Sequence, residues 1–245
     1  NNPYEWYKKI SLGTSGKIMN RMIRDISYFI ALSECVKRIY EENLLPDSEI
    51  RVIPNMYNPT FTDSQMRTLT QFEDVSDKTR LLYVGSLRET KGVEYLIRSV
   101  AHLSKEYHLF IAGSGGNEKR LRSLAEEMRL TDQITFLGQV PHESVPSLYA
   151  NAEIFVHPGI WPEPFGRTIL EAMQSGLPVV ATNRGGPAEV IPQDELLCKP
   201  RDPRSLSRKI KIAAEKRDEI SNTNLRAVEE YSPSSIVPQI ISIYD

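Results

Sequence analysis

The stretch "RLLYVGSLRETKGVEYLIRSV", residues 80–100, contains one complete strand, loop and helix pattern. Its first part, 80–86, is a near-continuous apolar run, which is typical of a parallel strand buried on both faces. Its last part repeats apolar residues at the i, i+3, i+4 and i+7 spacing of one helix face, at Val93, Leu96, Ile97 and Val100. The stretch therefore predicts a strand–helix unit with a charged loop at the carboxyl end of its strand.

The same pattern recurs toward the end of the chain. Further short apolar runs stand at 107–113, 134–138, 153–158 and 178–182. A second helix face is formed by Leu121, Leu124, Ala125 and Met128. Strands that alternate with helices predict a parallel, doubly wound α/β sheet.

The residues before this domain resemble the end of another such unit. "ISYFIAL" (26–32) and "IRVIP" (50–54) read as strands, and Ser33 can cap the helix between them. Residues 58–79 are polar and break the periodicity, which favours a linker. The chain has no initiator methionine, so we expect it to be part of a longer protein.

Composition excludes several classes of protein. The 245 residues are 40% hydrophobic and 25% charged with a net charge of −2, which gives no basis for a nucleic-acid partner. The apolar runs are much shorter than the roughly 20 residues of a membrane-spanning helix. Cys35 and Cys198 are the two cysteines. They could form one disulfide, but we expect two free thiols in a cytoplasmic protein.

The loops after the five predicted strands carry glycine, charge or both. In open α/β sheets, ligands bind beyond the carboxyl ends of the strands, where these loops converge. Arg88 and Lys91 can meet phosphates, and "GSGG" (113–116) can bring backbone N–H groups close to a ligand. A helix that begins near Phe165 or Gly166 adds free N–H groups. Together the loops predict a site for an anionic ligand that carries a sugar.

The segment "WPEPFGRTILEAM" (161–173) adds two carboxylates, Glu163 and Glu171. A carboxylate repels phosphate but accepts hydrogen bonds from two sugar hydroxyls, so we expect both to face hydroxyl groups. The alternative is a loop glutamate and an exposed helix glutamate without a shared role. The neighbouring loops favour the first interpretation.

"EPFGRTILE" resembles the E-x7-E signature of the retaining, GT-B-fold glycosyltransferases of family 4. "LLYVGSLRETKGVEYLI", "LFIAGSGG", "EAMQSGLPVVATNRGG" and "AEVI" follow the order of that family. The resemblance implies a Rossmann-like donor domain at 80–245. It also implies that 1–57 is the last portion of the N-terminal, acceptor domain, joined by the linker at 58–79.

The resemblance also implies roles for individual residues. Glu171 would hold the ribose hydroxyls, Glu163 the transferred sugar, and Lys91 a phosphate. Phe165 would meet the sugar, and Arg167 would lie near the diphosphate. The further donor-binding residues would be Gly85, Ser86, Gly113, Gly115, Gly138, Val140, Gly166 and Thr168.

One position departs from the family pattern. The family usually has arginine five positions before the lysine, where this chain has Ser86. Arg88 is the candidate substitute, and we group it with Lys91 and Glu163 as a candidate catalytic residue.

The implied reaction is transfer of a sugar from a UDP-, GDP- or ADP-sugar with retention of configuration. The resemblance implies no cofactor and no metal, and the chain has no Asp-x-Asp. The acceptor would be a glycan, a lipid-linked molecule or a small molecule. We expect peripheral membrane contact, at the inner face, to pass through the rest of the N-terminal domain.

Other functions stay open at this point. A sugar-nucleotide epimerase of the same fold and a non-catalytic binding fragment fit the same loops. A glycoside hydrolase would leave the phosphate-suited loops without a role. A dinucleotide-dependent oxidoreductase would need a third glycine where Glu118 stands.

Overall fold

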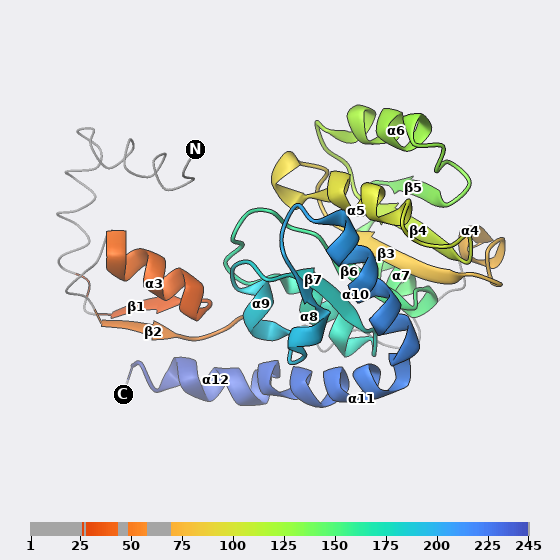
Figure 1. The fold of residues 1–245 in the computed structure, drawn as a ribbon. Helices are drawn as coiled ribbons and strands as arrows, with labels where there is room; N and C mark the ends of the chain where they lie inside the picture. Colours follow the sequence, from red (N-terminus) through yellow and green to blue (C-terminus); the bar gives the residue numbers. More distant parts are fainter. Residues whose placement is uncertain (1–25, 27, 44–48, 58–69, 245) are drawn as a thin grey trace.

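The computed structural model describes residues 26, 28–43, 49–57 and 70–244 (Figure 1). Its larger sheet has six parallel strands in the order β5-β4-β3-β6-β7-β8. The strands are β3 (Thr79–Val84), β4 (Tyr107–Ala112), β5 (Ile134–Gly138), β6 (Ile154–His157), β7 (Val179–Thr182) and β8 (Leu197–Cys198). The predicted parallel α/β sheet is confirmed. Only β8 was missed, because two residues are too few to form an apolar run.

The strand order places a topological switch point between β3 and β6. The chain builds outward from β3 through β4 to β5, returns to β6 on the other side of β3, and continues to β7 and β8. β3 pairs with β6 in the register Leu81↔Ile154. The loops that leave these two strands therefore diverge and open a crevice, the usual ligand position in this kind of sheet.

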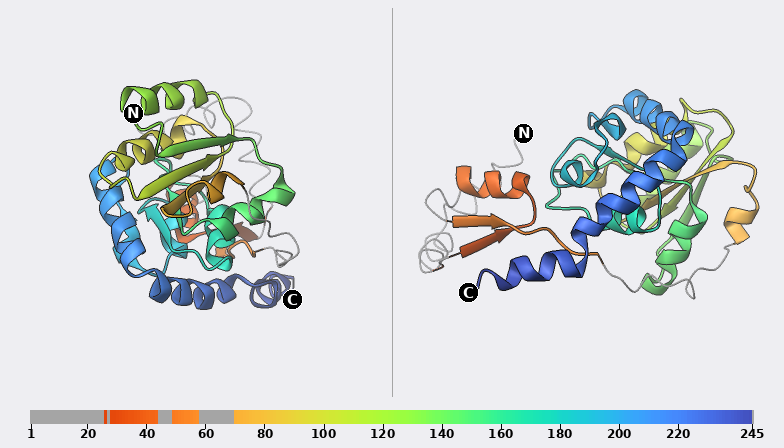
Figure 2. Two further views of the ribbon diagram at one scale, coloured as in Figure 1. Left: turned by 90° about the vertical axis from the view of Figure 1, so that its right-hand side faces the viewer. Right: turned by 90° about the horizontal axis from the view of Figure 1, so that it is seen from below.

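Helices cover both faces of this sheet (Figure 2). On one face, α10 packs against α5 and α5 against α6, while α7 and α8 lie on the other face and α8 contacts α11. The bounds are α5 (Val93–Val100), α6 (Glu118–Glu127), α7 (Val145–Asn151), α8 (Arg167–Gln174), α9 (Pro187–Val190), α10 (Pro203–Glu215), α11 (Arg217–Ala227) and α12 (Pro233–Ile241). The central strands are fully buried at Leu81, Leu109 and Phe155, and each such side chain contributes roughly 1.5–3 kcal/mol.

The end of the expected linker packs on this domain. Helix α4 (Thr70–Glu73) carries the buried Phe72, whose ring stacks on Phe110 of β4 with 3.8 Å between centroids. Residues 58–69 lie outside the described ranges. Within the expected linker, residues from Phe72 onward thus contribute to the core.

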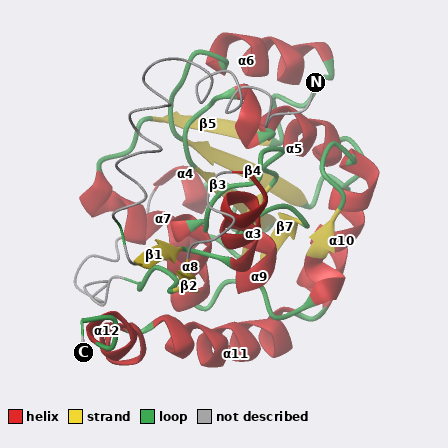
Figure 3. Ribbon diagram, turned by 90° about the vertical axis from the view of Figure 1, so that its left-hand side faces the viewer, coloured by secondary structure: helices red, strands yellow, loops and turns green. Residues whose placement is uncertain are grey.

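A smaller unit precedes the segment that we expected to be a linker. It contains β1 (Tyr28–Ala31), α3 (Glu34–Asn43) and β2 (Glu49–Val52), with the two strands parallel. Ser33 caps α3 as predicted, since its Oγ accepts a hydrogen bond of 3.3 Å from the Val36 N–H. The unit lies beside α9, and α12 runs beneath it (Figures 1 and 3). We call β1, α3 and β2 with the adjoining residues 32–33 and 53–57 the N-terminal unit.

Candidate functional site

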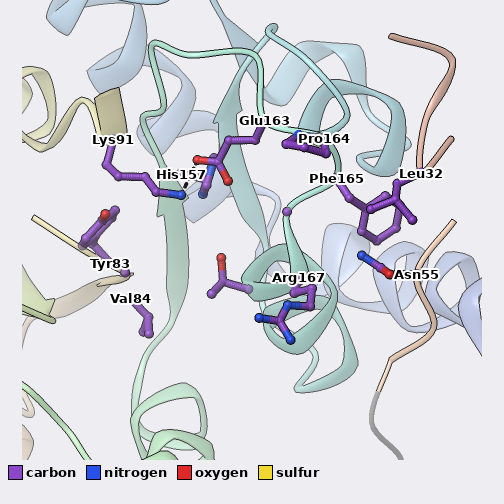
Figure 4. A pocket seen from close by; sticks show the side chains of 13 residues that line it. Leu32, Asn55, Tyr83, Val84, Lys91, His157, Glu163, Pro164, Phe165 and Arg167 are labelled. Carbon is purple, nitrogen blue, oxygen red and sulfur yellow. Dashed lines mark hydrogen bonds and ion pairs between the residues drawn. The ribbon is translucent and has the colours of Figure 1, made fainter. Parts of the chain in front are cut away.

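A pocket of about 290 Å³ opens at the switch point between β3 and β6 (Figure 4). Its walls come from the loops after these strands, from the start of α8 and from the N-terminal unit. The lining residues are Leu32, Asn55, Tyr83, Val84, Gly85, Lys91, His157, Glu163, Pro164, Phe165, Gly166, Arg167 and Thr168. Predicted site residues from both strand-end loops thus meet in one place.

Lys91 and Glu163 form an ion pair across this pocket. The Lys91 Nζ donates to the Glu163 Oε1 at 2.6 Å, and their side chains are 27% and 16% exposed. Gly92 explains how the two loops come so close. It has φ +68°, and a Cβ there would lie 2.0 Å from the Pro158 carbonyl oxygen. The Ile160 N–H also donates to the Thr90 carbonyl at 3.0 Å, which joins the loops directly.

His157, the last residue of β6, lies against the Glu163 carboxylate. It is 4% exposed, and its Nε2 is 3.4 Å from the Glu163 Oε1. Burial alone would raise the pKa of Glu163, but the interactions with His157 and Lys91 outweigh it and lower that pKa to about 2. Glu163 is therefore firmly ionised at neutral pH.

The start of α8 supplies backbone donors to the same pocket. The helix begins at Arg167, and Gly166 is its N-cap with φ +105°. We expected the start near Phe165 or Gly166, and the positive φ of Gly166 explains the small difference, because a residue in that conformation cannot belong to the helix. The first N–H groups of a helix lack intrahelical partners, and Arg167 and Thr168 line the pocket at this end. This end of the pocket is therefore suited to an anion.

The glycines after β7 hold the Glu163 segment in place. The Gly186 N–H donates to the Glu163 carbonyl at 2.9 Å, and Gly185 forms a parallel bridge with Glu163. A Cβ on Gly186 would lie 2.3 Å from the Pro164 carbonyl oxygen. The "GG" of "TNRGG" is therefore required by close backbone packing.

Glu171 lies outside the pocket lining, about one turn inside α8. Its Oε2 accepts a hydrogen bond of 2.9 Å from the Tyr149 hydroxyl. Burial raises the pKa of Glu171, and the Tyr149 bond together with the charges of His142 and Arg167 offsets only part of that rise. His142 follows β5 in the segment that also contains Val140, one of the predicted donor-binding residues, and its charge is among those that act on Glu171.

The remaining predicted residues do not line this pocket, namely Ser86, Arg88, Gly113, Gly115, Gly138 and Val140. Arg88 is exposed on the loop of Lys91, and the Ser86 carbonyl accepts from the Tyr83 hydroxyl at 3.0 Å. A Cβ on Gly113 would lie 1.8 Å from the Gly85 carbonyl oxygen, and one on Gly115 would lie 2.7 Å from that of Leu87. Packing between neighbouring loops is sufficient to require both of these glycines.

Several lining residues were not assigned from the sequence. Leu32 and Asn55 come from the N-terminal unit, directly after β1 and shortly after β2. His157 is the last residue of β6. The strand-end rule that identified Lys91 and Glu163 was not applied to the two strands of the N-terminal unit, where it would have identified Leu32 and Asn55. His157 ends one of the strands to which the rule was applied, but a buried histidine at a strand end is equally consistent with a structural role.

The described residues contain no cluster of three or more His, Cys, Asp or Glu side chains that could hold a metal ion. None of the helices described is long and apolar enough to cross a membrane. Cys35 and Cys198 are both free thiols.

Known proteins share this sequence pattern. The sequence profile of the family "Glycosyl transferases group 1" matches residues 67–229. An uncharacterised glycosyltransferase of Methanocaldococcus jannaschii is 30% identical over 215 residues, which cover 81% of this chain and 54% of that protein. A phosphatidylinositol N-acetylglucosaminyltransferase component of Arabidopsis thaliana is 28% identical over 200 residues, which cover 80% of this chain and 44% of that protein. The chain thus spans about half the length of these curated relatives.

The fold is shared with solved GT-B structures. The crystal structure of Anabaena HepE in complex with UDP superposes with a TM-score of 0.80 at 24% identity, covering 89% of this chain and 63% of that one. Sucrose-phosphate synthase of Thermosynechococcus elongatus gives a TM-score of 0.78 at 24% identity, over 98% of this chain and 64% of that one. At this identity the likeness shows a common Rossmann-like fold.

Proposed function

The chain belongs to the glycosyl transferases group 1 family, and from this premise we propose that it binds and activates the sugar-nucleotide donor of a retaining glycosyltransferase. The observation that carries the proposal is the Lys91–Glu163 pair at the switch point of the sheet. It sets a cation and an ionised carboxylate side by side where a ligand of this fold binds. The UDP complex of the structural neighbour HepE supports a nucleotide donor.

Transfer requires that the bond between the anomeric carbon and the diphosphate oxygen breaks. Negative charge then develops on the departing diphosphate, and positive charge develops on the sugar ring. Lys91 and the N–H groups at the start of α8 would stabilise the first, and their position in one pocket supports this role. The exposed Arg88, on the same loop as Lys91, is a second cation for the diphosphate. We assign no step to a metal ion or to a cofactor.

The two glutamates would serve different parts of the donor. Glu163, which is ionised and lines the pocket, would accept hydrogen bonds from the sugar hydroxyls and face the positive charge of the ring. Glu171 already accepts from one hydroxyl, that of Tyr149, and the ribose would offer it others. Phe165 and Gly166 border the sugar end, and the loop with Gly138 and Val140 would border the base.

The proposal gives the chemical class of the donor and of the acceptor. We propose a nucleoside diphosphate sugar as donor and a glycan, lipid-linked or small hydroxyl compound as acceptor. The name of the Arabidopsis relative includes both an N-acetylglucosaminyl group and phosphatidylinositol, which supports transfer rather than epimerisation. Because the relatives are about twice as long, we propose that the acceptor side needs sequence beyond this chain.

Calorimetry with UDP-, GDP- and ADP-sugars tests the proposal directly. We expect one nucleotide class to bind the chain. Glu171→Ala should weaken binding of that nucleotide by about tenfold, in the range of a lost charge-assisted hydrogen bond. Glu163→Ala should affect the nucleotide sugar much more than the free nucleotide. Absence of binding by any of the three classes would contradict the proposal, and equal affinity in wild type and Glu171→Ala would contradict the role of Glu171.

A further inference from the structure

Glu189 joins two parts of the chain that lie 155 positions apart in sequence. It is an exposed residue of the short helix α9, on the side of the larger domain. Its Oε2 accepts a hydrogen bond of 2.8 Å from the Glu34 N–H, and its Oε1 accepts one of 2.7 Å from the Cys35 N–H. Both oxygens of one carboxylate thus bind the first turn of α3 in the N-terminal unit.

This contact completes the cap of α3. The first N–H groups of a helix lack intrahelical partners. Here Glu189 receives the first two, and the Ser33 side chain receives the third, that of Val36. The negative carboxylate also faces the positive end of the helix dipole. The larger domain therefore supplies most of the cap for a helix that belongs to the other unit.

The helix that carries Glu189 is fixed to the candidate site. α9 follows Gly185 and Gly186 directly, and these two residues pack against the backbone of Glu163 and Pro164. Pro187 and Val190 of α9 are buried. The Glu189 side chain is thus exposed, but the helix that carries it is packed against the Glu163 segment.

On the other side of the contact, the N-terminal unit reaches the pocket. Leu32 stands two positions before Glu34, and both Leu32 and Asn55 line the pocket (Figure 4). In that view they lie across the pocket from Lys91. A second contact fixes the far end of the unit, because the Tyr57 N–H donates to the Tyr231 carbonyl at 3.0 Å.

We propose that Glu189 is a positioning residue that holds the N-terminal unit against the donor pocket, so that Leu32 and Asn55 close its open side. The part of this inference that concerns the donor rests on the proposed function. The part that concerns the docking of the unit does not, since it follows from the hydrogen bonds of Glu189 alone. Nothing in this role requires Glu189 to touch the donor.

Amide hydrogen exchange of the chain tests the docking without any ligand. Glu189→Gln replaces one of the two acceptor oxygens by an NH₂ group that faces an N–H donor. We expect exchange at Glu34 and Cys35 to become about three- to thirtyfold faster, the range for a lost helix cap. We also expect faster exchange at Tyr57, which Glu189 does not touch, because the whole unit loosens. The matched control is Glu126→Gln, an exposed glutamate of α6, which should change neither.

Calorimetry then tests the effect on the site, with UDP as the probe because the structural neighbour HepE is solved in complex with UDP. The affinity for UDP should fall about threefold in Glu189→Gln and stay unchanged in Glu126→Gln. Unchanged exchange at Glu34 and Cys35 would overturn the contact. Faster exchange there, with unchanged Tyr57 and unchanged UDP affinity, would reduce Glu189 to a local cap and overturn its positioning role. A wild-type chain that binds no sugar nucleotide would overturn the proposed function, while the response of Tyr57 would still decide whether Glu189 docks the unit.

Discussion

Glu163 and Glu171 lie eight positions apart in one short segment, yet their surroundings are opposite. Glu163 lies in the pocket against Lys91 and His157, and its pKa is lowered to about 2. Glu171 lies farther along α8 against the Tyr149 hydroxyl, and its pKa is raised. Both carboxylates are half-buried, and burial raises the pKa of each. The difference therefore comes from the groups in direct contact: His157 and the Lys91 ammonium outweigh burial at Glu163, whereas the neutral Tyr149 hydroxyl, with the charges of His142 and Arg167, offsets only part of it at Glu171.

This difference indicates how each carboxylate would respond to a donor. The Lys91 ammonium that pairs with Glu163 is the kind of group that a diphosphate attracts. Donor binding would therefore share the ammonium between Glu163 and the diphosphate. The Tyr149 hydroxyl that pairs with Glu171 is chemically similar to a ribose hydroxyl, so binding would add a hydrogen bond of the same kind. Glu163 and Glu171 are thus suited to different parts of one ligand, the sugar diphosphate and the ribose.

Breaking the ion pair between Lys91 and Glu163 should have the largest effect on stability and on UDP affinity. Lys91→Met leaves the Glu163 carboxylate half-buried without its lysine, and we expect the free energy of unfolding to fall by about 2–3 kcal/mol at pH 7. UDP affinity should fall at least tenfold, because a charge-assisted contact to phosphate is lost. Urea denaturation and calorimetry measure the two effects.

Lys119→Met on α6 is the matched control, because Lys119 is exposed and distant from the pocket. It should change the free energy of unfolding by no more than about 0.5 kcal/mol. If Lys91→Met were as stable as this control, the ion pair would not be the feature that distinguishes Glu163 from Glu171.

The pH dependence of stability should separate the two glutamates by sign. The pKa of Glu163 is lowered on folding, so its ionised form stabilises the fold above the unfolded pKa of about 4.3. This contribution is lost as the pH falls through about 2. The pKa of Glu171 is raised on folding, so the wild type loses stability relative to Glu171→Gln as the pH rises above about 4.3.

Urea denaturation of both glutamine variants between pH 3 and pH 7 measures this. The stability of the wild type relative to Glu163→Gln should grow with pH by roughly 2 kcal/mol over that range. Relative to Glu171→Gln it should decline with pH. Slopes of the same sign would mean that the partners of the two carboxylates do not control their ionisation.

The fold was readable from the sequence where strands are fully buried. Leu81, Leu82 and Phe110 belong to runs that are apolar on both faces, and these runs became β3 and β4. The strand order was not readable, because pairing between β3 and β6 joins residues more than 70 positions apart and leaves no local pattern. A two-residue strand such as β8 has no periodicity to detect.

The sequence predicted which residues belong to the site better than it predicted how those residues contact one another. Lys91 and Glu163 each follow a strand, so the strand-end rule places both at one edge of the sheet. Their ion pair depends on β3 and β6 being neighbours, which is a property of the strand order. Gly113 shows the opposite difficulty. A glycine that could approach a ligand and one that packs against Gly85 look alike in sequence.

Removing the hydrogen bond between Tyr149 and Glu171 should have the smallest effect on stability. Tyr149→Phe deletes the hydroxyl that donates to Glu171 but keeps the ring, which packs edge-on against Phe155 with 5.6 Å between centroids. We expect the free energy of unfolding to fall by about 1 kcal/mol, the usual net value of one hydrogen bond.

The hydrogen bond from Tyr149 also lowers the pKa of Glu171, so its loss should raise that pKa further. As the pH is lowered, the variant should therefore lose UDP affinity at a higher pH than the wild type, because Glu171 becomes protonated earlier. Tyr95→Phe on α5 is the control, and an unchanged pH profile in Tyr149→Phe would show that the tyrosine does not prepare Glu171 for the ribose.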